Sequence, residues 1–117
     1  MGVVSQSAYL QGIQLFNSRD FFAAHEVLED VWREAHNPEK KFLQALIQIA
    51  VALHHYSQGN HVGARSLLTR AHRNLENYPG RFGGVDLLLL RRSLESWHLA
   101  LKEHRSPPEY FQIRLQA

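Results

Sequence analysis

Long stretches without a helix breaker are the feature that most constrains how this sequence can fold. Its four prolines stand at positions 38, 79, 107 and 108, and five of its seven glycines stand at 59, 63, 80, 83 and 84. Between these positions the hydrophobic residues recur with the spacing of amphipathic helices, and no segment keeps the two-residue alternation of a strand. The sequence therefore predicts an all-α protein with no β-sheet.

These breaks divide the sequence into five predicted helices. Asp20 is a favourable N-cap for the second helix, Pro38 suits the first turn of the third, and Gly59 follows its end. The predicted helices span residues 5–16, 21–36, 38–58, 60–78 and 86–104. The tail that follows the proline pair is apolar enough to dock on the bundle, through Tyr110, Phe111, Ile113 and Leu115. A length of 117 residues suits one hydrophobic core, so residues 1–117 are expected to form a single domain.

The third predicted helix is apolar on nearly every side. Projected at 100° per residue, it has one narrow polar strip, which consists of Gln44, Gln48 and His55. Ala45 and Ala52 border this strip, and small side chains there allow a neighbouring helix to approach closely. We therefore expect this helix to lie at the centre of the bundle.

Composition narrows the classes of function. The chain has no cysteine, which excludes disulfides and thiolate metal ligands and leaves His, Asp and Glu as the strong protein ligands. The sequence shows neither an N-terminal leader pattern nor a long apolar segment, so a cytoplasmic protein without a membrane span is expected. Formal net charge is only +2, and the arginines of the second half scatter around the fourth helix, which disfavours nucleic acid as a partner. Whether these basic residues bind a smaller anion is left open.

The candidate site lies in the second predicted helix, within FFAAHEVLEDVW. Its HEVLE segment, residues 25–29, begins like the HExxH signature of zinc proteases but ends in Glu29 instead of a second histidine. His25 and Glu29 are one turn apart at the edge of the apolar face, and Phe22 projects just beyond them. We therefore expect both side chains to be shielded from bulk solvent.

Two interpretations of this pair remain open. In the first, His25 and Glu29 bind a divalent metal such as zinc, a third ligand comes from the third helix, and Glu26 acts as general base toward a metal-bound water in a hydrolytic reaction. The donors available for that third position are His55, His54 and Gln48. In the second, Glu29 accepts hydrogen bonds from His25, the Trp32 indole or Gln48 in a buried network that fixes the helix register. The chain would then be a noncatalytic interaction module that binds a partner protein or a second copy of itself.

Three segments carry a family resemblance: FNSRDFFAAHEVLEDVWR, then FLQALIQIAVALHHYSQGNHVGARSLLTRAHRNLENYP, then GVDLLLL. From Phe16 to Leu90 the sequence resembles the small bacterial and archaeal family catalogued as domain of unknown function number 309. The HxxxExxW motif of that family falls on His25, Glu29 and Trp32, and its LIQ motif falls on residues 46–48. The resemblance implies a compact up-and-down helical bundle and a suggested metal site, but no established activity. A glycine is usual before LIQ, where this sequence has Ala45.

Overall fold

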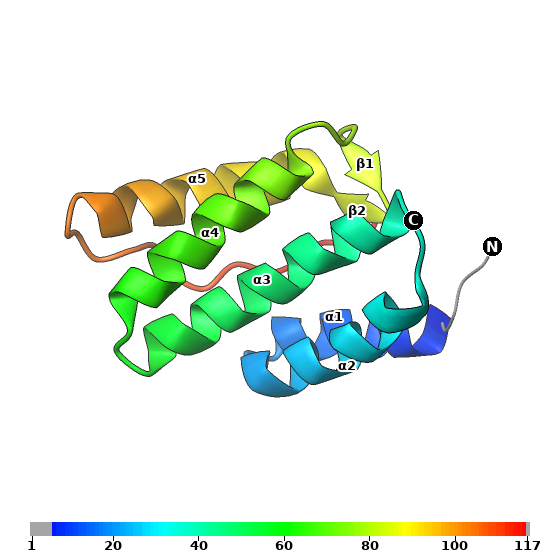
Figure 1. Cartoon of the computed structure of the whole chain (residues 1–117). Coiled ribbons are helices and arrows are strands. Elements are labelled where there is room, and N and C mark those ends of the chain that lie inside the picture. Colours follow the sequence, from blue (N-terminus) through cyan, green and yellow to red (C-terminus); the bar gives the residue numbers. More distant parts are fainter. Residues whose placement is uncertain (1–5, 117) are drawn as a thin grey trace.

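The computed structural model describes residues 6–116, and in this range it shows five α-helices and one short hairpin (Figure 1). The helices are α1 (Gln6–Asn17), α2 (Phe21–Glu34), α3 (Glu39–Ser57), α4 (His61–Leu75) and α5 (Leu87–Lys102), and the hairpin strands are β1 (Arg81–Phe82) and β2 (Val85–Asp86). Each predicted helix is present, with ends that differ by up to three residues. The all-α prediction is thus confirmed.

Consecutive helices pack side by side in an up-and-down arrangement, with α3 between α2 and α4 (Figure 1). Eight residues of α3 are buried, more than in any other helix among the described residues. They are Phe42, Leu43, Ala45, Leu46, Ile49, Ala50, Ala52 and Leu53. Such a helix is stable only when apolar neighbours cover it on several sides. The prediction that the third helix is central is therefore confirmed.

The expectation of no sheet is wrong, because two consecutive glycines reverse the chain after α4. Gly83 and Gly84 have φ angles of 59° and 75°, which suit a two-residue hairpin turn and which other residues rarely adopt. The flanking strands pair Arg81 with Asp86 and Phe82 with Val85. Tyr9 of α1 donates a hydrogen bond to the Gly83 carbonyl at 2.6 Å, so the hairpin is attached to the first helix.

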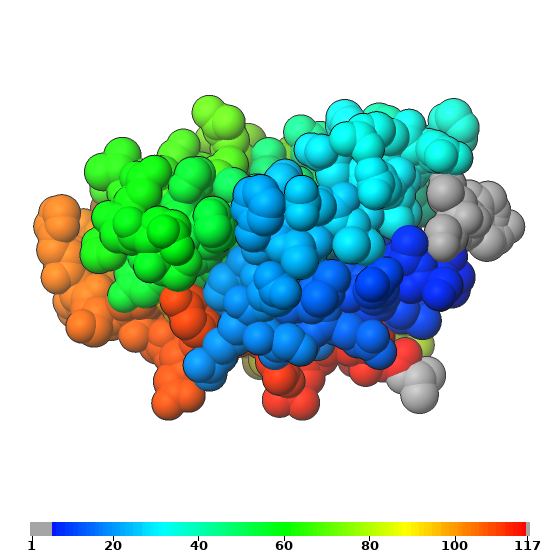
Figure 2. Space-filling view, turned by 90° about the horizontal axis from the view of Figure 1, so that it is seen from below, coloured from blue at the N-terminus to red at the C-terminus, as the bar shows by residue number. Residues whose placement is uncertain are grey.

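The C-terminal tail packs along the bundle, as predicted, although Leu115, one of the residues expected to dock, is 45% exposed. Ile113 is 1% exposed, and its backbone N–H and carbonyl both bond to the side chain of Asn17, at 2.7 and 3.1 Å. The Phe111 ring lies 5.8 Å from Phe16 of α1 and 6.2 Å from Trp97 of α5, so the tail joins the first and last helices. Figure 2 shows the tail, in orange and red, beside α1 on the underside of the molecule.

Helix caps agree only in part with the sequence. Asn60 and Asp86 accept hydrogen bonds from Gly63 and Leu89 in the first turns of α4 and α5. Asp20, the predicted cap of the second helix, makes no such bond with its side chain. Packing of the apolar face of α2 is enough to fix where that helix begins. No helix within residues 6–116 is both long and apolar enough to cross a lipid bilayer.

Candidate functional site

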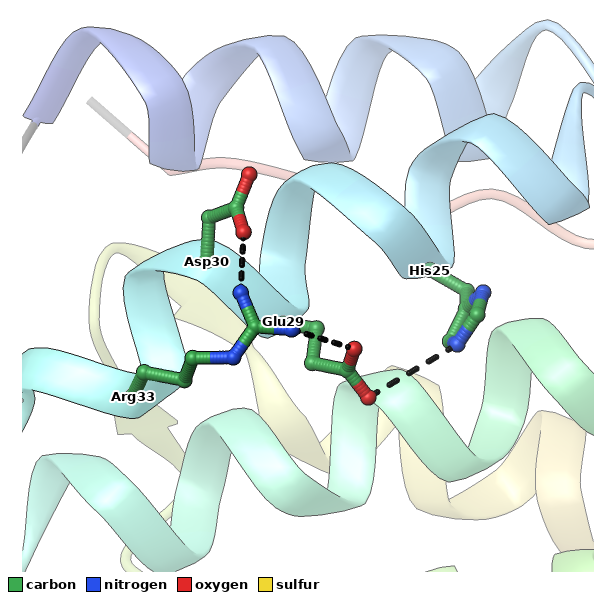
Figure 3. A network of polar contacts seen from close by, with 4 residues as sticks. All are labelled: His25, Glu29, Asp30 and Arg33. Carbon is green, nitrogen blue, oxygen red and sulfur yellow. Dashed lines mark hydrogen bonds and ion pairs between the residues drawn. The ribbon is translucent and has the colours of Figure 1, made fainter.

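The polar residues of the motif form a ladder along one side of α2 (Figure 3). Glu29 accepts a hydrogen bond from Arg33, with 3.0 Å between Oε1 and Nη2, and Arg33 also binds Asp30. His25 lies on the other side of Glu29, with 3.8 Å between Nε2 and Oε2. That separation is an ion-pair distance when the imidazole is protonated, and it is too long for a hydrogen bond. All four side chains come from the same helix.

This ladder is open to water, so the expectation that the motif is shielded is wrong for Glu29. The Glu29 side chain is 39% exposed and that of His25 is 23% exposed, and Phe22, whose ring lies 5.5 Å from the His25 ring, is itself 51% exposed. The apolar face of α2 is fully used by α1 and α3, and the motif stands at its edge. Because water reaches the carboxylate, its charge needs no buried partner.

Two of the three donors expected from α3 face a different neighbour. Gln48 accepts a hydrogen bond from Asn74 of α4, with 2.9 Å between Oε1 and Nδ2. His55 stands seven residues after Gln48, two helical turns, and so it shares that face of α3. The predicted cluster of His25, Glu29 and Gln48 does not form, because α3 turns its amide toward α4 and away from α2.

The third donor expected from α3 lies near α2. The His54 ring is 5.4 Å from Phe22, and the Phe22 ring is 5.5 Å from His25. A phenyl ring thus contacts both imidazoles on the surface where α2 meets α3. Adjacent residues of a helix point about 100° apart, so His54 and His55 cannot both face α2.

Trp32 holds the end of α2 to the start of α3. The ammonium group of Lys40 lies 4.1 Å from the centroid of the indole ring and also donates to the Trp32 carbonyl at 2.9 Å. This pair combines a cation–π contact with a hydrogen bond. The indole Nε1 is buried and has no hydrogen-bond partner among the described residues, so the predicted bond from Trp32 to Glu29 is absent.

The donor set does not fit a metal centre. Within residues 6–116, no three His, Asp or Glu side chains come together in a way that could hold a metal ion. Protein zinc sites use at least three such ligands. The pair formed by His25 and Glu29 supplies two, and Arg33 already occupies one carboxylate oxygen. Glu26, the residue predicted to act as general base, is exposed on the outer face of α2.

Sequence reasoning missed a basic groove between α4 and α5. Its lining includes five basic side chains, namely His61, Arg65, His98, His104 and Arg105. A usable signal exists in the sequence, because His61 and Arg65 are four residues apart on one helix face, and His104 and Arg105 stand together where the fifth predicted helix, which carries His98, ends. Counting all the arginines of α4 together hides this local concentration, and the sequence does not say which faces of the two helices meet.

Comparison with known proteins gives relatives without an assigned activity. The chain is 36% identical over 111 residues to a protein of Aquifex aeolicus (strain VF5) described as uncharacterised, a match that covers 93% of this chain and 33% of that protein. It is 38% identical over 73 residues to the uncharacterised protein YpuF of Bacillus subtilis (strain 168), covering 59% of this chain and 41% of YpuF. The chain therefore spans less than half the length of either relative.

A family model for a domain of unknown function, DUF309, matches residues 9–67. The match extends from α1 into α4 and includes the ladder of α2. It thus covers half of the chain, and both the helical fold and the HxxxExxW motif agree with the resemblance seen in the sequence. This chain belongs to the DUF309 family.

Proposed function

We propose that this chain is a noncatalytic helical binding module, in which the ladder on α2 belongs to a surface that docks a protein partner. The observation that carries the proposal is the engagement of Glu29 by Arg33 on a water-exposed helix edge. A hydrolytic metal site needs a carboxylate free to ligate, a third ligand and an open coordination position in a sheltered cavity. The ladder has none of these features, so the metal-dependent hydrolase is the weaker of the two interpretations.

Charge and shape indicate the partner's chemistry. α2 carries four carboxylates, Glu26, Glu29, Asp30 and Glu34, against one arginine. Beside them the half-exposed ring of Phe22 is a large apolar side chain of the kind that anchors protein interfaces. A protein surface that offers lysine or arginine side chains around an apolar recess would complement both features. The matches to parts of longer relatives also fit a domain that works next to other protein segments.

The experiment that separates the two functions uses the tag-free chain and two variants, Glu29→Gln and the neighbouring control Glu26→Gln. We expect mass spectrometry after dialysis against zinc to find no stoichiometric metal in any of the three proteins. Glu29→Gln should lower the free energy of unfolding by at most about 1 kcal/mol, because it removes an exposed ion pair. Urea denaturation measures this change.

The opposite result is equally clear. About one zinc per chain in the unmodified protein, lost in Glu29→Gln and kept in Glu26→Gln, would support the metal-site interpretation. A loss of stability of about 1 to 3 kcal/mol in Glu29→Gln without any bound metal would instead support the interpretation as a buried network.

A further inference from the structure

A groove of about 660 Å³ lies between the first half of α4 and the last turns of α5, and the turn that leads into the tail closes one end. This volume is within the range of about 300 to 1,000 Å³ that small-molecule sites occupy. The groove is on the opposite side of α3 from the α2 ladder, because α4 and α2 pack on different faces of that helix (Figure 1). Its role is therefore independent of the docking surface.

The groove wall is basic and contains no carboxylate side chain. Arg65 projects into it from α4, and its guanidinium group has no hydrogen-bond or ion-pair partner among the described residues. Arg105 also lines the groove and is held by Glu103, with 2.8 Å between Nε and Oε1. Five N–H donors of an unpaired arginine in a concave site favour a ligand that brings its own acceptor oxygens.

Three histidines also line the groove. They are His61 at the start of α4, His98 in α5 and His104 just after the end of α5. Burial is the main reason that the pKa of His98 lies below its ordinary value, and the positive charges of Arg65, Lys102 and His72 add to that effect. An anion in the groove would relieve the repulsion among these groups.

The remaining wall suits the uncharged part of an organic ligand. The Tyr56 ring stacks on His61, with 4.7 Å between centroids and 18° between planes, and it packs edge-on with Trp97, with 5.0 Å between centroids. Val62 and Leu101 provide apolar surface, and the hydroxyl of Ser66 adds a polar group. The Tyr56 ring is therefore held in place by packing before any ligand binds.

We propose that this groove binds a small organic molecule that carries a phosphate group. The phosphate would accept hydrogen bonds from Arg65 and the neighbouring imidazoles, and the organic part would lie against Tyr56 and Leu101. A phosphate dianion has three terminal oxygens and two charges, so it matches several convergent cationic donors better than a carboxylate does. The volume of the groove exceeds what inorganic phosphate alone would fill.

The test titrates the intact chain with AMP, glucose 6-phosphate, inorganic phosphate and acetate at constant ionic strength. Nitrogen–proton correlation spectra follow the backbone amides. We expect shifts confined to Tyr56 and residues 61–69 and 98–106, larger for the organic phosphates than for inorganic phosphate, and absent with acetate. Arg65→Gln should weaken the binding of the organic phosphate at least about tenfold. Arg70→Gln on the same helix lies outside the groove and should leave affinity unchanged.

Three outcomes would overturn the proposal. One is the absence of saturable shifts with either organic phosphate. Another is equal weakening by Arg65→Gln and Arg70→Gln, which would indicate general attraction to a basic surface. The third is shifts centred on other helices. Spectral dispersion and the thermal midpoint of each variant report folding, and the milder Arg65→Lys, which keeps the charge and loses the guanidinium fork, provides a second variant if Arg65→Gln does not fold.

Discussion

At Glu29 the nearest cation decides what the carboxylate can do. His25 and Arg33 stand on either side of it along α2, four residues before and four after, and both spacings allow contact within one helix. The arginine is always charged and makes the shorter contact, so it is the main partner of the carboxylate. The same reasoning applies to Arg65, which has no carboxylate at those spacings and remains free to bind an external anion.

His98 should make the fold sensitive to mild acid. Its pKa is lower in the folded chain than its ordinary value of 6.5, mainly because of burial and then because of Arg65, Lys102 and His72. Between the two pKa values the unfolded chain binds more protons than the folded one, so acidification favours unfolding. This contribution to stability is present above pH 6.5 and is lost as the pH falls through the folded pKa.

The measurement is the free energy of unfolding from urea titrations between about pH 5 and pH 8. In His98→Gln the decline on the acid side should be shallower than in the unmodified chain. His36→Gln, which changes an exposed histidine at the end of α2, is the matched control and should keep the original slope. Identical slopes in all three proteins would contradict the assignment to His98.

At the scale of elements, two contacts hold the first half of the bundle together. The crossing of α1 and α2 depends on Gly12, because a Cβ atom built there would lie 2.6 Å from Cδ2 and 2.7 Å from Cγ of Leu28. The tail makes the second contact, since Asn17 and Phe16 bind it to the end of α1. The first contact needs a small residue at position 12, because a larger side chain there would separate the two helices.

Gly12→Ala should destabilise the protein although alanine is the better helix former. The added methyl overlaps Leu28, which is fully buried and cannot move into solvent. Overpacking of this kind typically costs about 1 to 3 kcal/mol, more than the gain of up to about 1 kcal/mol from helix propensity. Thermal and urea denaturation test this balance.

Gln11→Ala is the control, because it places the same side chain one residue earlier on the exposed face of α1. It should be neutral or slightly stabilising. If Gly12→Ala proved as stable as Gln11→Ala, the two helices would not be in the close contact that the structure shows.

At the scale of the whole molecule, charge is segregated across α3. α2 on one side carries four carboxylates and one arginine, whereas α4 on the other side carries three arginines and no carboxylate. Two copies can therefore present complementary surfaces, with the α2 ladder of one facing Arg70 and Arg73 of the other. Such a contact joins different surfaces of the two copies, so it builds open chains instead of a closed dimer.

Sedimentation equilibrium should detect this association at low salt. The weight-average mass is expected to rise with protein concentration at low ionic strength and to return to that of the monomer in concentrated sodium chloride, because salt screens exposed charges. The double variant Glu29→Gln/Asp30→Asn should stay monomeric. The control Glu103→Gln changes a carboxylate that follows α5 and is not on α2, so it should associate as the unmodified chain does. A monomer under all conditions would exclude a second copy as the partner and leave a different cationic protein.

Much of the fold could be predicted from the sequence, because it depends on local periodicity. Helix breakers fix the helix ends, and they stand at Pro38, Gly59 and residues 79–84. Apolar residues of the tail favour packing against the bundle over contact with water. The hairpin was missed because two strands of two residues leave no alternating pattern. Its turn could have been found from Gly83 and Gly84, which follow each other between two apolar residues.

The candidate site was less accessible, because its chemistry depends on neighbours that the sequence does not specify. Helical spacing correctly places His25, Glu29 and Arg33 along one helix, and Gln48 and His55 along another. Only the packing of α4 against α3 turned Gln48 toward Asn74, and only the edge position of α2 left Glu29 in water. The helical period sets the direction in which a side chain points from its own helix. The exposure of that side chain to solvent and its contact partners depend on how the helices pack around one another. The sequence alone therefore determined the elements and their apolar faces, and the tertiary structure decided which polar groups meet.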